Sequence, residues 1–206
     1  MQRKLTVILS ADLVGYSALM ERDEAGTLAR LMENRKSLFD PRVAAHEGRL
    51  FKLMGDGALV EFPSAAAAVT CALAIQAAME AAEAHRPATE RLRYRIGVNL
   101  GDVIVDGEDI YGEGVNVAAR LQALAPEGGI AVSRNVHDQV TGKLAAVFED
   151  LGAHALKSGE APVHAYIVHP HASLERADQD TGARPAIAIC VLPFANISGD
   201  QEQEYF

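Results

Sequence analysis

Strand-like and helix-like segments alternate along this chain in an order that few folds accommodate. β-rich or alternating apolar runs lie at 4–12, 48–62 and 91–107, and apolar residues recur at helical spacing over 21–47, 64–82 and 114–125. The second run is broken by Gly55-Asp56-Gly57, a pattern typical of a tight turn between two strands. The resulting order, β-α-β-β-α-β followed by further α and β elements, predicts a ferredoxin-like α+β fold.

The expected helices have recognisable boundaries. The segment 21–47 predicts one long amphipathic helix, or two around Pro41, ending at Gly48. Ser64 is expected to cap an alanine-rich, closely packed helix, and Pro126 follows the helix over 114–125. Shorter elements are expected further on, a strand at 130–133, a helix at 134–141, and strands at 146–150 and 163–168.

The composition changes after His169. The segment 170–185 is polar and has no periodicity, which indicates a linker, and a new apolar strand begins at Ala186. We therefore expect one domain over 1–169 and the incomplete start of a C-terminal region over 186–206.

Composition and charge exclude several classes of protein. A formal net charge of −9 argues against general affinity for nucleic acid. No apolar stretch approaches the roughly 20 residues of a membrane span, and no secretory signal is visible, so a cytoplasmic location is expected. Cys71 and Cys190 are distant in sequence and lie in apolar contexts, which favours packed thiols over a disulfide or a zinc site.

Two carboxylates are placed where strands end or turn. Asp12 follows the first strand and Asp56 lies in the tight turn, so adjacent central strands could bring them together. Paired carboxylates with few other ligands suit Mg²⁺, which keeps several waters and accepts phosphate oxygens as ligands. Gly15 and Ser17 stand at the entry to a helix, where free N–H groups favour phosphate. The alternative is that Asp56 only serves the turn.

A second polar group lies on the helix predicted over 114–125. Asn116 and Arg120 are four residues apart and share one face, where an amide and a guanidinium can meet one ligand. The alternative is an ordinary solvated helix face.

Three blocks in order, "SADLVGYS", "FKLMGDG" and "DIYGEGVNVAARL", resemble the catalytic domain of class III nucleotide cyclases, particularly bacterial adenylate cyclases, over about residues 4–168. The resemblance implies that Asp12 and Asp56 bind two Mg²⁺ or Mn²⁺ ions. It implies that Asn116 positions the ribose and that Arg120 stabilises charge on the transferring phosphorus.

The resemblance also assigns Lys52 and Asp109 to base recognition. Adenine presents an N6 donor, which Asp109 can accept, and an N1 acceptor, to which Lys52 can donate, whereas guanine reverses both. Unpaired polar groups at a buried site are costly, so ATP is expected over GTP. Lys157 stands roughly where the family has a triphosphate-binding lysine, and the alternative for it is a surface lysine.

The implied reaction is attack of the ribose 3′-oxygen on the α-phosphorus, giving 3′,5′-cyclic AMP and pyrophosphate. In this family the site is shared between two domains, so the resemblance implies a homodimer, with a regulatory module expected beyond this chain. The competing interpretation is a non-catalytic cyclase-like module that binds nucleotide or protein. A diguanylate cyclase is disfavoured because its Gly-Gly-acid-acid-Phe signature is missing from the sequence.

Overall fold

A computed structural model describes residues 1–155 and 162–170 of the chain. The linker and the C-terminal region expected over 170–206 thus lie almost wholly outside the described residues. The described strands form one eight-stranded sheet in the order β2-β3-β1-β4-β6-β8-β7, with β5 paired to β4. The strands are β1 (Gln2–Leu13), β2 (Arg49–Met54), β3 (Gly57–Phe62), β4 (Tyr94–Asp106), β5 (Asp109–Tyr111), β6 (Ile130–Ser133), β7 (Ala146–His154) and β8 (Val163–Pro170).

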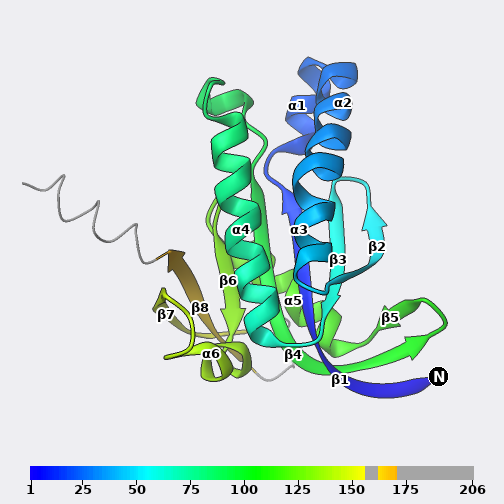
Figure 1. The fold of residues 1–206 in the computed structure, drawn as a ribbon, viewed down its shortest axis with the longest axis vertical. Helices are drawn as coiled ribbons and strands as arrows, with labels where there is room; N and C mark the ends of the chain where they lie inside the picture. The colour runs from blue at the N-terminus through cyan, green and yellow to red at the C-terminus, as the bar shows by residue number, and fades with distance from the viewer. Residues whose placement is uncertain (156–161, 171–206) are drawn as a thin grey trace, which may run out of the picture.

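Helices cover both faces of this sheet (Figure 1). The layer in front contains α1 (Tyr16–Arg22), α2 (Glu24–Asn34), the π-helical turn η1 (Arg35–Phe39), α3 (Asp40–Ala45) and α4 (Ala65–Glu83), and α5 (Glu113–Leu124) lies behind the sheet. A short 3₁₀ turn, η2 (Ala88–Glu90), precedes β4, and α6 (Arg134–Val140) follows β6. The predicted ferredoxin-like α+β order is confirmed.

The alternation of side chains along β1 explains why the sheet is covered twice. Val7 and Leu9 belong to the large core shared with α2, α3 and α4, while Ile8 packs with Val115 and Ala118 of α5. Successive residues of a strand point to opposite faces, so apolar residues at consecutive positions require a layer on each side. The first half of β4 lies between β1 and β6 and is likewise buried on both faces. Its alternating sequence pattern predicted a strand with only one buried face.

Glycine on β4 lets α5 lie close to the sheet. A Cβ atom on Gly97 would stand 2.2 Å from the carbonyl oxygen of Ala118 and 2.2 Å from the backbone nitrogen of Gln122. At the other end of the helix, the buried amide of Asn99 donates to the carbonyl of Gly114 at 3.0 Å. Both contacts fix where α5 sits on the sheet, and with it the polar residues that the helix carries.

The segment predicted as one or two helices over 21–47 contains three helical pieces after α1. Asp40 donates its backbone N–H to the carbonyl of Arg35, five residues back, which makes η1 a π turn. Pro41 is the second residue of α3, directly after this π turn. Ser64 caps α4 as predicted, accepting from the Ala67 N–H at 3.1 Å. The strand predicted at 146–150 continues to His154.

By length and composition alone, α4 is apolar enough to cross a membrane, which the sequence analysis did not anticipate. In this structure the helix packs on the sheet with Val69, Cys71 and Ile75 fully buried, and core helices pass the same test. The prediction that Cys71 is a packed thiol is confirmed, and burial raises its pKa to about 12. Cys190 lies outside the described residues.

A buried carboxylate ties three strands and the turn before β5 together at the end of the sheet away from Asp56. Glu61 of β3, with a side chain 9% exposed, accepts from Thr6 at 2.9 Å and pairs with Lys4 of β1 and with Arg49 of β2 at 3.0 Å. Arg49 also donates to the carbonyl of Glu108 at 2.9 Å, just before β5. Burial alone would raise the pKa of Glu61, but the hydrogen bonds from Lys4, Thr6 and Arg49 outweigh it and lower the pKa.

Glu61→Gln is expected to lower the free energy of unfolding at pH 7 by about 1–3 kcal/mol, because Lys4 and Arg49 lose their buried anion. A lowered native pKa contributes stability above the unfolded value of 4.5, and this contribution is lost as the pH falls through the native pKa. Urea unfolding should therefore show a difference from wild type at pH 7 that shrinks at pH 4 and below. The control is Glu108→Gln, whose side chain is 99% exposed and should change stability by less than about 0.5 kcal/mol. Equal stability of Glu61→Gln and wild type at pH 7 would contradict the prediction.

Candidate active site

The two carboxylates predicted to form a pair lie side by side. β1 pairs antiparallel with β3 in a register that places Ala11 opposite Ala58, so the end of β1 reaches the β2–β3 turn. Gly55 has φ of 62°, the left-handed conformation that a tight turn requires. The carboxyl groups of Asp12 and Asp56 come within hydrogen-bonding reach of one another.

The proximity of these carboxyl groups is electrostatically unfavourable. Partial burial raises the pKa of Asp12, and the charge and hydrogen bond of Asp56 raise it further, while the positive charge of Arg95 opposes the shift. Two ionised carboxylates that share a site repel one another, and a bound cation would relieve that repulsion. Carboxylate oxygens with few other protein ligands suit Mg²⁺ or Mn²⁺, so the donor set fits the metal that the sequence implied.

Arg95 is a candidate site residue that the sequence analysis missed. It lies on β4 directly opposite Asp12 of β1, and its Nε is buried without a hydrogen-bond partner among the described residues. An unpaired donor of this kind is costly unless a ligand or water satisfies it. The signal in the sequence is an arginine that stands between the hydrophobic residues Tyr94 and Ile96 in a strand-like run.

A second predicted pair is also brought together. Lys52 of β2 and Asp109 of β5 lie far apart in sequence, and in the structure the Lys52 Nζ is 3.8 Å from Oδ2 of Asp109. The Tyr111 hydroxyl donates to the same oxygen at 2.8 Å, and the Lys52 Nζ lies 5.1 Å from the centre of the Tyr111 ring. The side chains of Lys52 and Asp109 are 37% and 39% exposed, so the pair remains accessible to a ligand.

Asn116 and Arg120 lie on α5, as predicted, four residues apart. The neighbouring Val115 and Ala118 pack toward β1 and β4, and Asn116 is exposed. Among the contacts of the described residues, none joins Asn116 to the Asp12 and Asp56 pair. Among the described contacts, the carboxylates and Asn116 thus belong to separate groups within one chain.

Two of the residues predicted to bind phosphate, Gly15 and Ser17, lie at the start of α1. Gly15 has φ of 64° at the start of α1, and Ser17 is exposed in the first turn of that helix. Lys157 lies outside the described residues.

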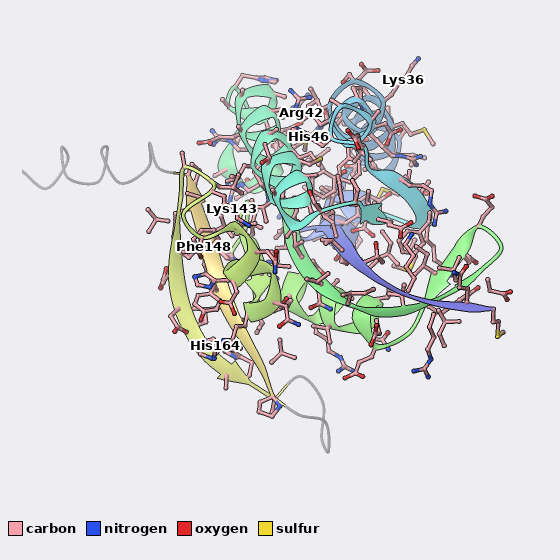
Figure 2. The ribbon with its side chains drawn as sticks, turned by 60° about the horizontal axis from the view of Figure 1, so that its bottom comes forward. Lys36, Arg42, His46, Lys143, Phe148 and His164 are labelled. Atoms are coloured by element: carbon pink, nitrogen blue, oxygen red, sulfur yellow. The ribbon has the colours of Figure 1, made fainter. Side chains whose placement is uncertain are left out.

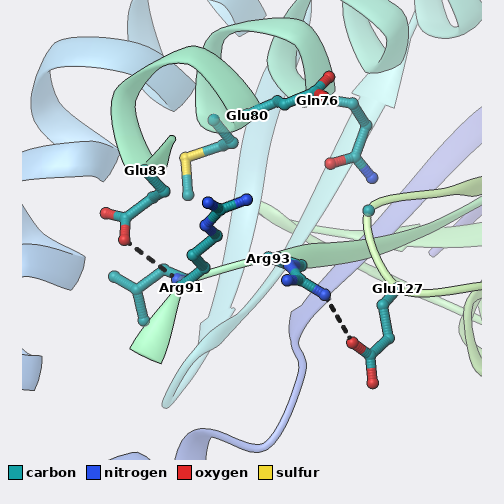
Figure 3. Close-up of a pocket in the computed structure, with 9 residues that line it drawn as sticks. Gln76, Glu80, Glu83, Arg91, Arg93 and Glu127 are labelled. Atoms are coloured by element: carbon teal, nitrogen blue, oxygen red, sulfur yellow. Dashed lines mark hydrogen bonds and ion pairs between the residues drawn. The ribbon is translucent and has the colours of Figure 1, made fainter. Parts of the chain in front are cut away.

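A hollow beside the end of α4, shown in Figure 3, contains arginines that are already paired. Its volume is about 290 Å³. Arg93 donates to Glu127 at 2.9 Å, Arg91 donates to the carbonyls of Arg86 and Ala84, and Glu83 accepts from the backbone N–H of Leu92, so these polar groups mainly hold the chain between α4 and β4.

Histidines gather at the β7 edge of the sheet. Figure 2 shows Phe148 and His164 on this edge, at the opposite side of the ribbon from the β4–β5 hairpin. The rings of His137 and Tyr166 stack at 3.9 Å between centroids, and His164 contacts Asp150 at 2.6 Å. These contacts join α6, β7 and β8.

Comparison with known proteins agrees with this fold. Residues 2–170 match the family Adenylate and Guanylate cyclase catalytic domain. The chain is 47% identical to "Putative adenylate cyclase 3" of Rhizobium meliloti over its whole length, and covers 36% of that protein. It is 35% identical to an adenylate cyclase of Streptomyces coelicolor over 59% of the chain, and covers 30% of that protein. The chain thus spans about a third of the length of these curated relatives.

Solved structures show the same fold. The crystal structure of an adenylate/guanylate cyclase/hydrolase from Silicibacter pomeroyi has a TM-score of 0.77 at 43% identity, covering 82% of this chain and 98% of that one. An adenylyl cyclase from P. aeruginosa has a TM-score of 0.70 at 27% identity, covering 81% and 94%.

The fold is a mixed α/β domain in which two carboxylates lie together at the end of a central strand. The chain belongs to the adenylate and guanylate cyclase catalytic domain family.

Proposed function

We propose that this domain is an adenylate cyclase that converts ATP to 3′,5′-cyclic AMP and pyrophosphate. The observation that carries the proposal is the presence of two predicted groups in one fold, the Asp12 and Asp56 carboxylates and the Lys52–Asp109 pair. The similarity to adenylate cyclases of Rhizobium and Streptomyces supports the same assignment.

Asp12 and Asp56 would hold two divalent cations, Mg²⁺ or Mn²⁺. When bound, such ions offset the charge of the triphosphate and lower the cost of forming the 3′-alkoxide. Arg95, beside Asp12, places a further positive charge where the phosphates would lie. We also assign phosphate contacts to the backbone at Gly15 and Ser17, as the resemblance implies.

The remaining groups act on the nucleoside and the reacting phosphorus. Asn116 would hold the ribose so that its 3′-oxygen faces the α-phosphorus, and orientation of this kind contributes much of the rate of an internal displacement. Arg120 would stabilise the charge that develops on the phosphorus, and Lys157 is proposed to contact the triphosphate. No covalent nucleophile is needed.

No described contact joins Asn116 to the carboxylates within one chain, which favours a site shared between two chains. In a two-fold homodimer, the carboxylates of one protomer would meet the base-reading residues, Asn116 and Arg120 of its partner, giving two equivalent sites. A monomer is then expected to be inactive.

The test is formation of cyclic nucleotide by the purified chain with ATP or GTP and with Mg²⁺ or Mn²⁺. We expect kcat/KM for ATP to exceed that for GTP by at least about 30-fold, since two mismatched buried hydrogen bonds cost about 1 kcal/mol each or more. Equal turnover of the two nucleotides would contradict the base assignment. Nucleotide binding by a folded dimer without any cyclic product would contradict the enzyme and favour a binding module.

A further inference from the structure

Tyr111 makes both of its polar contacts to the pair assigned to base recognition. Its hydroxyl donates to Oδ2 of Asp109 at 2.8 Å, and its ring lies 5.1 Å from the Nζ of Lys52, which is itself 3.8 Å from the same Oδ2. The Tyr111 residue is 46% exposed, so burial in a core does not explain its position. The side chains of Lys52, Asp109 and Tyr111, from β2 and β5, thus all contact one another.

The backbone that carries Asp109 is held independently. Arg49 donates to the carbonyl of Glu108 at 2.9 Å, and the buried Glu61 fixes the same guanidinium. On the other side, Asp109 is opposite Asp106 in the β4–β5 ladder. The backbone on both sides of Asp109 is therefore anchored, and what remains variable is the rotation of its carboxylate.

The hydroxyl of Tyr111 limits that rotation. The terminal torsion of an aspartate is broad, so an exposed carboxylate without a fixed donor samples many orientations. Both described contacts are made to Oδ2, which leaves Oδ1 as the acceptor without a partner among the described residues. The hydrogen bond and charge of Asp109 raise the pKa of the Tyr111 phenol, so the hydroxyl keeps its proton at neutral pH and remains a donor.

We propose that Tyr111 is a positioning residue for base selection, whose hydroxyl holds Oδ2 of Asp109 so that Oδ1 accepts from the amino group of adenine. The ring of Tyr111 also holds the Lys52 ammonium beside that carboxylate by a cation–π contact. This inference rests on the proposed adenylate cyclase activity, and it adds a residue that reads the base through Asp109 rather than by touching it.

The decisive variant is Tyr111→Phe, which removes only the hydroxyl and keeps the ring over Lys52. We expect kcat/KM for ATP to fall about tenfold while that for GTP changes by less than about twofold, so the ATP/GTP ratio drops about tenfold. Since the base is remote from the reacting atoms, most of the loss should be in KM. Tyr111→Leu should lower the ratio further, and thermal melting should show that both variants stay folded.

A second measurement does not depend on activity. In protein labelled with ¹³Cζ-tyrosine, Asp109→Asn should lower the pKa of the Tyr111 phenol, because the charged acceptor is lost. An unchanged ATP/GTP ratio in Tyr111→Phe, with wild type making cyclic AMP, would overturn the role of Tyr111 and leave the proposed function standing. Wild type making no cyclic nucleotide would overturn the proposed function and this inference with it.

Discussion

Asp56→Asn is expected to reduce cyclic nucleotide formation by at least about 10³-fold with either Mg²⁺ or Mn²⁺. Asparagine keeps the size of the side chain and tolerates the turn after Gly55, but it removes one of the two charges that would hold the metal. The loss should appear in kcat/KM measured at saturating metal, because one carboxylate cannot hold two cations in place as two carboxylates can.

The same substitution is expected to raise the melting temperature of the protein in EDTA at pH 7. The pKa of Asp12 is raised in the native state by burial and by Asp56, so ionising it works against folding, and this cost is fully present above the native pKa. Removing the charge of Asp56 relieves part of the cost. The gain should shrink as the pH falls to values where Asp12 is protonated in both states.

The matched control is Asp138→Asn, an exposed aspartate on α6 that contacts Arg134 and His137. This variant should keep both activity and melting temperature. Near-wild-type activity of Asp56→Asn would contradict the metal assignment, and a lower melting temperature in EDTA would contradict the repulsion between the carboxylates.

A mixture of Asp12→Ala and Arg120→Ala chains is expected to regain activity that neither variant has alone. If each site takes its carboxylates from one protomer and its arginine from the other, a mixed dimer contains one intact site and one doubly defective site. Random assortment makes half of the dimers mixed, so a 1:1 mixture should show about a quarter of the wild-type specific activity. The assay is cyclic AMP formation after the chains are mixed, unfolded and refolded together.

The control for this experiment is a mixture of Asp12→Ala and Asp56→Ala chains. Both substitutions affect the carboxylate half, so every site in the mixed dimer carries one defect and the mixture should stay inactive. Absence of rescue in a mixed dimer of Asp12→Ala and Arg120→Ala, confirmed by two different affinity tags, would show that the sites are not shared.

Much of the fold follows from local patterns in the sequence. The alternation of strand and helix segments predicted the βαββαβ order, and Ser64 marked the start of α4 because an N-cap is a local interaction. The contact of Asp12 with Asp56 was also predictable, since a tight turn between two strands delivers its central residue to the end of the neighbouring strand.

Other features depend on tertiary contacts that local patterns do not determine. Arg95 comes to Asp12 through the register of β1 with β4, and Tyr111 reaches Lys52 only because the β4–β5 hairpin returns beside β2. The pairing of Lys52 with Asp109 was predicted through the resemblance, not from spacing. The π turn at η1 was missed because helical periodicity barely changes over a single wider turn.

The position of β3 has a consequence for which mutant chains of this protein could complement one another. This strand begins directly after Asp56, pairs with Lys52 through Leu59, and ends near Glu61, which holds Arg49 and the backbone before Asp109. At about 3.3 Å per residue it spans only about 20 Å, yet it supports residues assigned to two different sites of the proposed dimer. A substitution that displaces β3 would therefore damage both the carboxylates and the base-recognition residues of the same chain. A partner chain that carries a defect in only one of these groups could not restore activity in a mixed dimer.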